Sequence, residues 1–321
     1  MVEKDLFGHT VDPFATALER YGVWPTTVWE VDYQDRGTRD LKALIGDIGY
    51  ERPEGSTAGK DFTRLRGGRV PYASERNNGS VPLWGHQTRA GAFTAPADDE
   101  SVYRGKVTAS IFNPAVAAWL LNCFAPAVGH VFDPFAGGGT RAIMAAKRGL
   151  TYLGTEIRAE EVLAVRARLA ACGVTAGVTI QHGDARTCDA IAMCSADFCL
   201  TCPPYWNLEQ YNGGPDDLSM IESYPRFLAE LGRVIAQTHR ILKPGALSCW
   251  VVGLHRRETT GELTALHHDV TRLHQAHGFT LREEIILSQK GNGAIQRVGN
   301  FEKGERRLVR THEYALVFRA T

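Results

Sequence analysis

The sequence predicts a doubly wound α/β fold built around a mostly parallel β-sheet. From residue 106 onward, short apolar runs that are typical of buried strands alternate with longer segments of helical composition. Between the first of these strands and the helix that follows, residues 137–139 are three glycines in a row. This alternation favours strands that lie side by side in one sheet, with helices on its faces.

Each element is predicted from its composition and from the residues that end it. Strands are expected over residues 130–132, 150–156, 178–183, 196–201, 246–253, 281–287 and 313–318. Helices are expected over residues 115–124, 141–147, 159–172, 220–242 and 262–277. The tripeptide at 243–245, Lys-Pro-Gly, is a typical helix stop. No helix is predicted between the last two strands, so we expect them to form an antiparallel pair.

The first 105 residues are less regular, and we expect an accessory region over 1–105 followed by the α/β domain over 106–321. Residues 24–33 have strand-like composition, and short helices are expected after Asp12 and over residues 38–48. Residues 51–96 are rich in Gly, Pro, Ser, Asn and Arg. This stretch is either a mobile surface segment or a basic segment that follows a phosphate backbone and becomes ordered on binding.

The overall charge excludes a uniformly basic protein, since Lys plus Arg and Asp plus Glu both number 36. Any phosphate-binding surface must therefore be local. One candidate is the segment between the last two strands, which carries Lys290, Arg297, Lys303, Arg306, Arg307 and Arg310. The alternative for this segment is a solvated hairpin loop with a run of charges.

Other features exclude membrane, secreted and metal-binding classes. No apolar run approaches the about 18 residues of a membrane span, and the N-terminus does not resemble a signal peptide. The seven cysteines lie mostly in apolar or helical context, which indicates reduced thiols and a cytoplasmic protein. Cys199 and Cys202 have C-x-x-C spacing, but no second Cys or His pair accompanies them, so no metal is expected.

The glycine turn at residues 133–140, DPFAGGGT, favours a ligand site. A strand that leads through glycines into a helix points backbone N–H groups and the helix N-terminus at a ligand on the carboxyl edge of a parallel sheet. Glycine lets the ligand approach closely because it has no Cβ atom. The spacing differs from the G-x-G-x-x-G of dinucleotide enzymes, so a nicotinamide cofactor is disfavoured.

Two motifs in this order, DPFAGGGT at 133–140 and TCPPYW at 201–206, resemble those of S-adenosylmethionine-dependent DNA amino-methyltransferases. The similarity covers about residues 106–319, and the TCPPYW variant looks like those of phage-encoded site-specific methylases. It implies a class I methyltransferase fold, S-adenosyl-L-methionine as the cofactor and duplex DNA with a flipped base as the partner. The setting would be the cytoplasm of a bacterium or a phage-infected cell, and the oligomeric state stays open.

By this resemblance, the cofactor is held by the glycine turn and by acids at the ends of the next two strands. The turn contributes Asp133, Phe135, Ala136, Gly137, Gly139 and Thr140. Glu156 would bind the ribose hydroxyls and Asp184 the adenine amino group, while Phe112 and Asn113 would pack under the methionine moiety. Structural alternatives are open: Glu156 as an exposed strand end or a helix cap, and Asp184 as a turn former. Asn113 could be an ordinary helix cap before a proline.

The resemblance places catalysis at Cys202, Pro203, Pro204 and Tyr205. An exocyclic amino nitrogen is a poor nucleophile because its lone pair is delocalised into the ring. The Cys202 side chain and the Pro203 carbonyl would accept hydrogen bonds from the amino group and so make its nitrogen more nucleophilic. Tyr205 would stack on a base that is flipped out of the duplex. Trp206 would form a wall of the pocket and contact the nucleic acid, and phosphate contacts would come from Arg297, Arg306, Arg307 and Arg310.

Cys202 departs from the family pattern, in which Ser, Asp or Asn supplies an oxygen acceptor. A thiol accepts weakly, which leaves more of the task to the Pro203 carbonyl and to Thr201. Covalent catalysis is disfavoured, because carbon-5 cytosine enzymes carry Pro-Cys-Gln instead. The non-acidic residue at 202 and the following Trp206 favour cytosine N4 over adenine N6. The alternatives are an RNA base, a non-catalytic subunit with this fold, and a Pro-Pro-aromatic turn that merely ends a strand.

Overall fold

A computed structural model describes residues 28–32, 112–206, 208, 211, 213–257, 261–290 and 311–321. Several predictions lie outside these residues: the helices after Asp12 and over 38–48, the segment 51–96, and the basic segment with Arg297, Arg306, Arg307 and Arg310. The irregular N-terminal region is likewise outside, except for one strand at 28–32. No helix within the described part of the chain is long and apolar enough to cross a bilayer.

The core is one eight-stranded sheet with the order β1-β9-β10-β6-β5-β2-β3-β4. Only β10 runs antiparallel to its neighbours β6 and β9, and the other pairings are parallel. This is the class I methyltransferase sheet, extended by β1, so the predicted fold class and the predicted antiparallel pair are confirmed. The strands are β1 (Val28–Asp32), β2 (His130–Asp133), β3 (Thr151–Glu156), β4 (Val178–His182), β5 (Ala196–Thr201), β6 (Leu242–Val252), β9 (Phe279–Lys290) and β10 (His312–Ala320).

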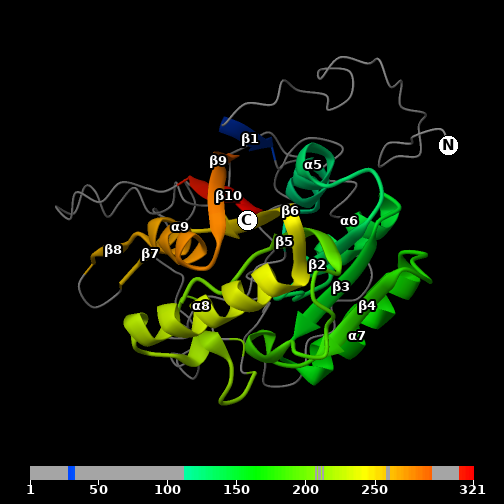
Figure 1. The fold of residues 1–321 in the computed structure, drawn as a ribbon, viewed down its shortest axis with the longest axis horizontal. Coiled ribbons are helices and arrows are strands. Elements are labelled where there is room, and N and C mark those ends of the chain that lie inside the picture. The colour runs from blue at the N-terminus through cyan, green and yellow to red at the C-terminus, as the bar shows by residue number, and fades with distance from the viewer. Residues whose placement is uncertain are drawn as a thin grey trace, which may run out of the picture.

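Helices cover both faces of the sheet, as Figure 1 shows. On one face lie α5 (Pro114–Phe124), α6 (Thr140–Lys147) and α7 (Ala159–Ala171), and on the other α8 (Tyr224–Ile241) and α9 (Leu266–Ala276). Successive strand residues alternate between the two layers, since Val131 packs with the first set of helices and Phe132 with the second. The hydrophobic runs of the central strands are therefore buried on both sides.

The chain changes direction across the sheet between β2 and β5. After β2 the chain enters α6 on one face, and after β5 it leads to α8 on the other. Such a switch point leaves a crevice at the carboxyl ends of the two strands, where ligands of open α/β sheets bind. The two motifs begin at these ends, with Asp133 as the last residue of β2 and Thr201 as the last residue of β5.

Two predicted helix starts are wrong by several residues. The helix expected from residue 220 begins at Tyr224, because the Ser223 side chain caps the Arg226 N–H and a proline occupies the first turn. Residues 218–220 form a separate 3₁₀ turn, η4 (Leu218–Met220). The helix expected from residue 262 begins at Leu266, because β8 (Leu263–Thr264) pairs with β7 (His255–Arg256) in a small hairpin.

The junction between α8 and β6 is only partly as predicted. The helix ends at Ile241, in agreement with the Lys-Pro-Gly stop, but β6 begins at once, at Leu242. Its pairing with β5 is irregular, since Ala196 faces Leu242 and Phe198 faces Leu247. The surplus residues form a bulge that includes Gly245 at φ +80°.

Candidate active site

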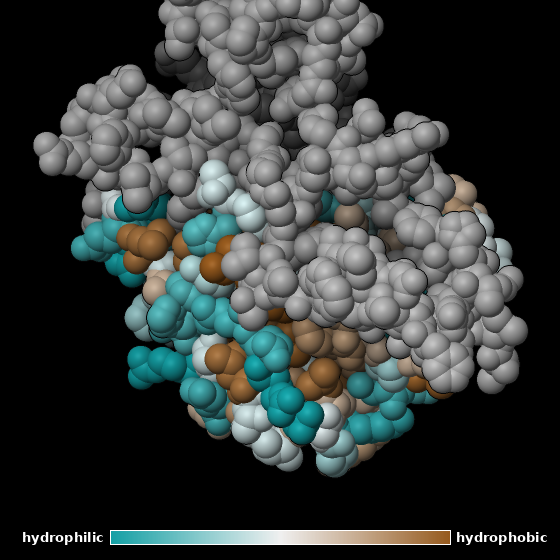
Figure 2. Space-filling view, turned by 90° about the horizontal axis from the view of Figure 1, so that it is seen from above, coloured by the Kyte–Doolittle hydropathy of each residue, from teal (hydrophilic) through white to brown (hydrophobic). Residues whose placement is uncertain are grey.

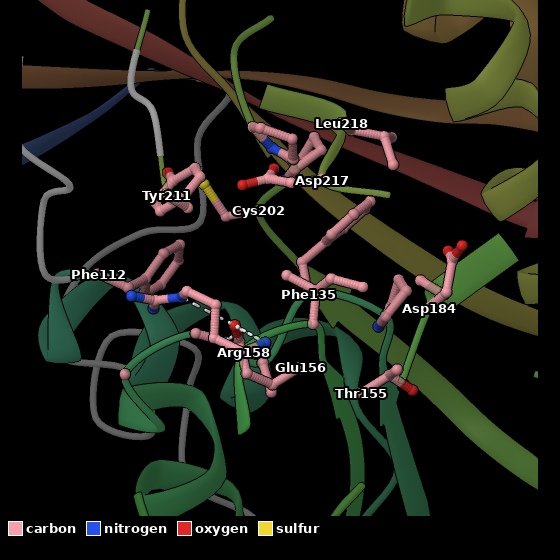
Figure 3. A pocket seen from close by; sticks show the side chains of 18 of the residues that line it. Phe112, Phe135, Thr155, Glu156, Arg158, Asp184, Cys202, Tyr211, Asp217 and Leu218 are labelled. Carbon is pink, nitrogen blue, oxygen red and sulfur yellow. Dashed lines mark hydrogen bonds and ion pairs between the residues drawn. The ribbon is translucent and has the colours of Figure 1, made fainter. Parts of the chain in front are cut away.

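A pocket opens at the carboxyl edge of the sheet, and residues of both motifs line it. The predicted residues that line it are Phe112, Phe135, Ala136, Gly137, Gly139, Thr140, Glu156, Asp184, Cys202, Pro203, Pro204 and Tyr205. Figure 3 shows side chains from separate parts of the chain converging on this space. The predicted Asp133, Asn113 and Trp206 are not among the lining residues.

The glycine turn needs its glycines for two reasons. Gly139 caps α6 in the left-handed region, at φ +81°, and a Cβ there would lie 2.6 Å from Val165 Cγ1 of α7. Gly137 is also left-handed, at φ +51°, but a Cβ there would meet only Phe135 O, at 3.8 Å. Gly139 therefore allows close packing of the helix, whereas Gly137 leaves open space on the pocket side.

Asp133 is a cross-link inside the protein. Its Oδ1 accepts from Phe135 N at 3.0 Å and from Thr201 Oγ1 at 2.6 Å. Its Oδ2 accepts from Arg141 Nε and from Tyr152 OH, both at 2.6 Å. The carboxylate is 0% exposed, and these donors occupy the about four acceptor positions that it has. The direct cofactor contact predicted for Asp133 does not fit this arrangement, since the residue instead joins the two motifs.

Glu156 lies at the end of β3 and lines the pocket. Its Oε2 accepts from Gly137 N at 3.0 Å, and its Oε1 accepts from Arg158 N at 3.0 Å and from Arg158 Nε at 3.1 Å. Burial raises the pKa of Glu156, although the Arg158 charge works in the opposite direction. The side chain is 7% exposed, so the alternative of an exposed strand end is wrong. One acceptor position remains for a ligand hydroxyl.

A buried ion-pair network supports Glu156 from behind, and sequence reasoning missed it. Arg158 Nη2 lies 3.3 Å from Glu161 Oε2, and Glu161 Oε1 lies 2.8 Å from Arg168 Nη1. The same Arg168 nitrogen donates to Gly138 O at 2.9 Å. The spacing of Glu161 and Arg168 in the sequence already places both side chains on one face of α7. The sequence does not show that this face packs against the glycine turn.

Asp184 combines a turn role with a place in the pocket lining. Its Oδ1 accepts from Arg186 N at 2.8 Å and caps η3 (Ala185–Thr187), as the turn-former alternative proposed. The Arg186 guanidinium, which sequence reasoning missed, pairs with Asp184 at 2.7 Å, with Glu230 of α8 at 2.6 Å and with Asp216 at 2.9 Å. This arginine ties the end of β4 to α8 and to the chain after the TCPPYW turn at residues 201–206, which is called the catalytic turn below for its predicted role.

The segment after the catalytic turn contributes pocket residues that were not predicted. Tyr211, Asp216, Asp217 and Leu218 line the pocket. Asp217 Oδ2 accepts from Gly213 N at 2.9 Å, and Asp217 Oδ1 accepts from Ser219 N at 2.8 Å. These Asp-centred turns fold the segment back over the site. Asp and Ser residues in a Gly-rich stretch do predict a turn, but this pattern does not predict which part of the structure the turn packs against.

Phe112 and Asn113 directly precede α5, and of these two only Phe112 lines the pocket. The Phe112 ring lines the pocket and lies 4.7 Å from the Arg141 guanidinium carbon. Asn113 Oδ1 accepts from Ala115 N at 2.9 Å, so the residue is the N-cap of α5, as its structural alternative proposed. Its Nδ2 is a buried donor without a hydrogen-bond partner.

The TCPPYW turn puts Cys202 into the pocket lining and leaves Pro203 and Pro204 buried. The Tyr205 hydroxyl lies 3.3 Å from Cys202 Sγ and 3.3 Å from Glu313 Oε1 of β10. Glu313 belongs to the C-terminal segment that resembles the family, but the sequence does not show that it reaches the catalytic turn.

Trp206 is held in the core, which argues against the predicted contact with nucleic acid. The side chain is 7% exposed, and its Nε1–H donates to Ile221 O at 2.8 Å. Its ring packs 5.1 Å from that of Tyr224 and 5.6 Å from that of His255. Trp206 has φ +58°, an uncommon conformation for a bulky residue. That backbone turn sends the ring into the core of the α8 layer, not into the pocket.

Comparisons with known proteins agree with the resemblance. Residues 196–321 match the sequence family described as DNA methylase. Type II methyltransferase M.ScaI of Streptomyces caespitosus is 33% identical over 104 residues, which are 30% of this chain and 34% of that protein. The chain thus spans about a third of this curated relative. The similarity to phage-encoded methylases stays a prediction.

Solved structures of two relatives are also similar. One is a Thermus thermophilus protein described as a DNA modification methylase, solved with S-adenosyl-L-methionine, at 29% identity and a TM-score of 0.33. The match covers 43% of this chain and 51% of that one. The other is an S-adenosylmethionine-dependent methyltransferase of Methanosarcina mazei, at 14% identity and a TM-score of 0.44, covering 63% of this chain and 96% of that one.

Proposed function

We propose that this protein transfers a methyl group from S-adenosyl-L-methionine to the exocyclic amino group of a DNA base. The main support is that the glycine turn, Glu156 and the turn at residues 202–205 all line one pocket. The hydrogen bond from Thr201 Oγ1 to Asp133 Oδ1, at 2.6 Å, fixes the two motifs against each other. The match of residues 196–321 to the DNA methylase family supports the same reaction class.

The residues present fit the proposed cofactor. Gly137 leaves space that a Cβ would fill, and Glu156 keeps one acceptor position for a ribose hydroxyl. Asp184 and Leu218 line the region where an adenine ring would lie, and the Phe112 ring lines the opposite end. When bound, S-adenosyl-L-methionine supplies an electrophilic methyl group on a sulfonium sulfur.

The catalytic turn would make the amino group nucleophilic. The Pro203 carbonyl and the Cys202 sulfur accept from the amino hydrogens, which shifts electron density back onto the nitrogen. Proline fixes the backbone at 203 and 204, so these acceptors keep their positions. Tyr205 stacks on the base and holds it at the cofactor end of the pocket. The reaction is thereby accelerated by positioning and electrostatics, without a covalent intermediate.

DNA contacts are proposed for the parts of the chain outside the described residues. The basic residues Arg297, Arg306, Arg307 and Arg310 would bind phosphates beside the catalytic turn, and residues 1–105 would contribute sequence recognition. The non-acidic Cys202 favours cytosine N4 over adenine N6 as the acceptor.

Transfer of a labelled methyl group tests the proposed function. Purified protein is incubated with methyl-labelled S-adenosyl-L-methionine and either duplex DNA, single-stranded DNA or bulk tRNA. Label is expected in DNA, and Tyr205→Ala should reduce it about 10-fold or more through lost stacking. Label in tRNA alone would assign an RNA substrate. Tight cofactor binding without transfer to any of the three would indicate a non-catalytic subunit.

A further inference from the structure

A line of polar contacts connects the catalytic turn with the last strand of the sheet. Cys202 Sγ lies 3.3 Å from the Tyr205 hydroxyl, which lies 3.3 Å from Glu313 Oε1. Glu313 is 108 residues from Tyr205 in sequence and stands near the start of β10. Neither contact is part of the motif resemblance. Together they connect the Glu313 carboxylate to the Cys202 thiol through the Tyr205 hydroxyl.

The Tyr205 ring packs closely against the backbone of Gly253, beside Glu313. Tyr314 pairs with Val252 in antiparallel register, so the residues next to them, Glu313 and Gly253, lie close together. A Cβ at Gly253 would lie 2.4 Å from Tyr205 Cε2 and 2.8 Å from Tyr205 Cδ2. Only glycine at this position lets the ring lie on the backbone, with its hydroxyl at the carboxylate.

The chemistry of the three groups sets the direction of these hydrogen bonds. An ionised carboxylate can only accept, so the Tyr205 hydroxyl donates to Glu313. The phenol oxygen then accepts from the S–H of Cys202. The thiol hydrogen is thus directed to Tyr205, and the sulfur presents a lone pair to the pocket that Cys202 lines.

We propose that Glu313 is a positioning residue that, through Tyr205, turns the Cys202 thiol into an acceptor for the amino group of the base. This inference rests on the proposed function. It explains how cysteine can stand where related enzymes carry an oxygen acceptor. A thiol whose hydrogen pointed into the pocket would oppose the amino hydrogens instead of accepting them.

Kinetics of matched variants test the effect on transfer. Glu313→Gln keeps the shape but removes the charge, and Glu283→Gln makes the same change at an exposed position of β9. Glu313→Gln should lower kcat about 10-fold, with the KM for S-adenosyl-L-methionine unchanged. Glu283→Gln should match the wild type. Because Glu313 acts through Tyr205, adding Glu313→Gln to Tyr205→Phe should cause no further loss.

Alkylation of Cys202 tests the contacts without any methyl transfer. Glu313→Gln removes the negative charge beside the Tyr205 hydroxyl and so favours the reactive thiolate of Cys202, which iodoacetamide should label about threefold faster or more. Mass spectrometry of the Cys202 peptide gives the rate, and the exposed Cys194 is the internal control. Equal Cys202 rates in Glu313→Gln and wild type would overturn the inference. Faster labelling in a protein that transfers no methyl group would keep these contacts and reject only the proposed function.

Discussion

Asp133 and Glu156 are two buried carboxylates beside one glycine turn, and their oxygens face different partners. The donors that occupy the Asp133 carboxylate belong to the protein itself, and the residue does not line the pocket. Glu156 does line the pocket and also accepts from Gly137 N. We therefore propose that Asp133 serves stability and Glu156 serves ligand binding, and single substitutions should show this.

Asp133→Ala should mainly reduce stability. The change leaves the buried Arg141 guanidinium without its carboxylate, which typically costs about 3–5 kcal/mol in the free energy of unfolding. Urea denaturation measures the loss, and Glu160→Ala at an exposed position of α7 is the control. Unchanged stability together with weakened cofactor binding would instead place Asp133 in direct contact with the cofactor.

Glu156→Gln should mainly reduce cofactor affinity. Glutamine retains one oxygen for Gly137 N but loses the charged acceptor that would face a ribose hydroxyl. The dissociation constant for S-adenosyl-L-methionine should rise about 10- to 100-fold in calorimetry. Glu160→Gln serves as the matched control. The same affinity in both variants would remove Glu156 from the ligand site.

At the scale of elements, the segment 211–218 lines one side of the pocket and contacts two other parts of the fold. Arg186 after β4 pairs with Asp216, and Glu230 on α8 holds the same guanidinium. Gly213 lies so close to Ile157 that an added Cβ would come within 2.6 Å of its Cγ2. The chain between the catalytic turn and α8 is thereby anchored beside the end of β3.

Helix α9 attaches to β10 through a buried histidine, which makes this attachment sensitive to acid. The His274 ring stacks 3.8 Å from Phe318, and its Nδ1–H donates to Val270 O at 2.8 Å. Burial lowers the pKa of His274 to about 3 from the ordinary 6.5. The unfolded chain therefore takes up this proton first. The stabilisation is present above about pH 6.5 and is lost as the pH falls towards 3.

Substitution of this histidine should flatten the acid sensitivity. Unfolding in urea at about pH 7.5 and about pH 5 gives the stability lost on acidification. His274→Phe keeps an aromatic ring against Phe318 and should lose less stability between these conditions than the wild type. His268→Gln, exposed on the same helix, should behave as the wild type does. An identical loss in His274→Phe and wild type would contradict the assignment.

For the molecule as a whole, the sequence predicts local features well and distant pairings poorly. The sheet could be predicted from the alternation of strands and helices, because each of these elements depends on residues that are neighbours in sequence. The helix cap at Ser223 is another local signal and could have corrected the predicted start of α8. The contacts from Thr201 to Asp133 and from Tyr205 to Glu313 span 68 and 108 residues, and no local pattern encodes them. Trp206 is the last residue of the TCPPYW motif, but its backbone turn at φ +58° sends its ring away from the pocket.

Several large apolar side chains are exposed in the described part of the chain. Among them, Leu163 lies on α7, whereas Val128 and Met193 lie in connections between elements. In Figure 2 hydrophilic and hydrophobic residues are intermixed on the described part of the visible surface. The proposed function rests on the pocket at the carboxyl edge of the sheet.

Identification of the atom that receives the methyl group tests the proposed function most directly. DNA is incubated with the protein and S-adenosyl-L-methionine that carries a trideuterated methyl group, then digested to nucleosides and analysed by tandem mass spectrometry. We expect the label on an exocyclic amino nitrogen, with cytosine N4 as the favoured site. A label on ring carbon 5 of cytosine, with a covalent adduct to 5-fluorocytosine DNA that Cys202→Ser abolishes, would contradict it and make Cys202 a nucleophile.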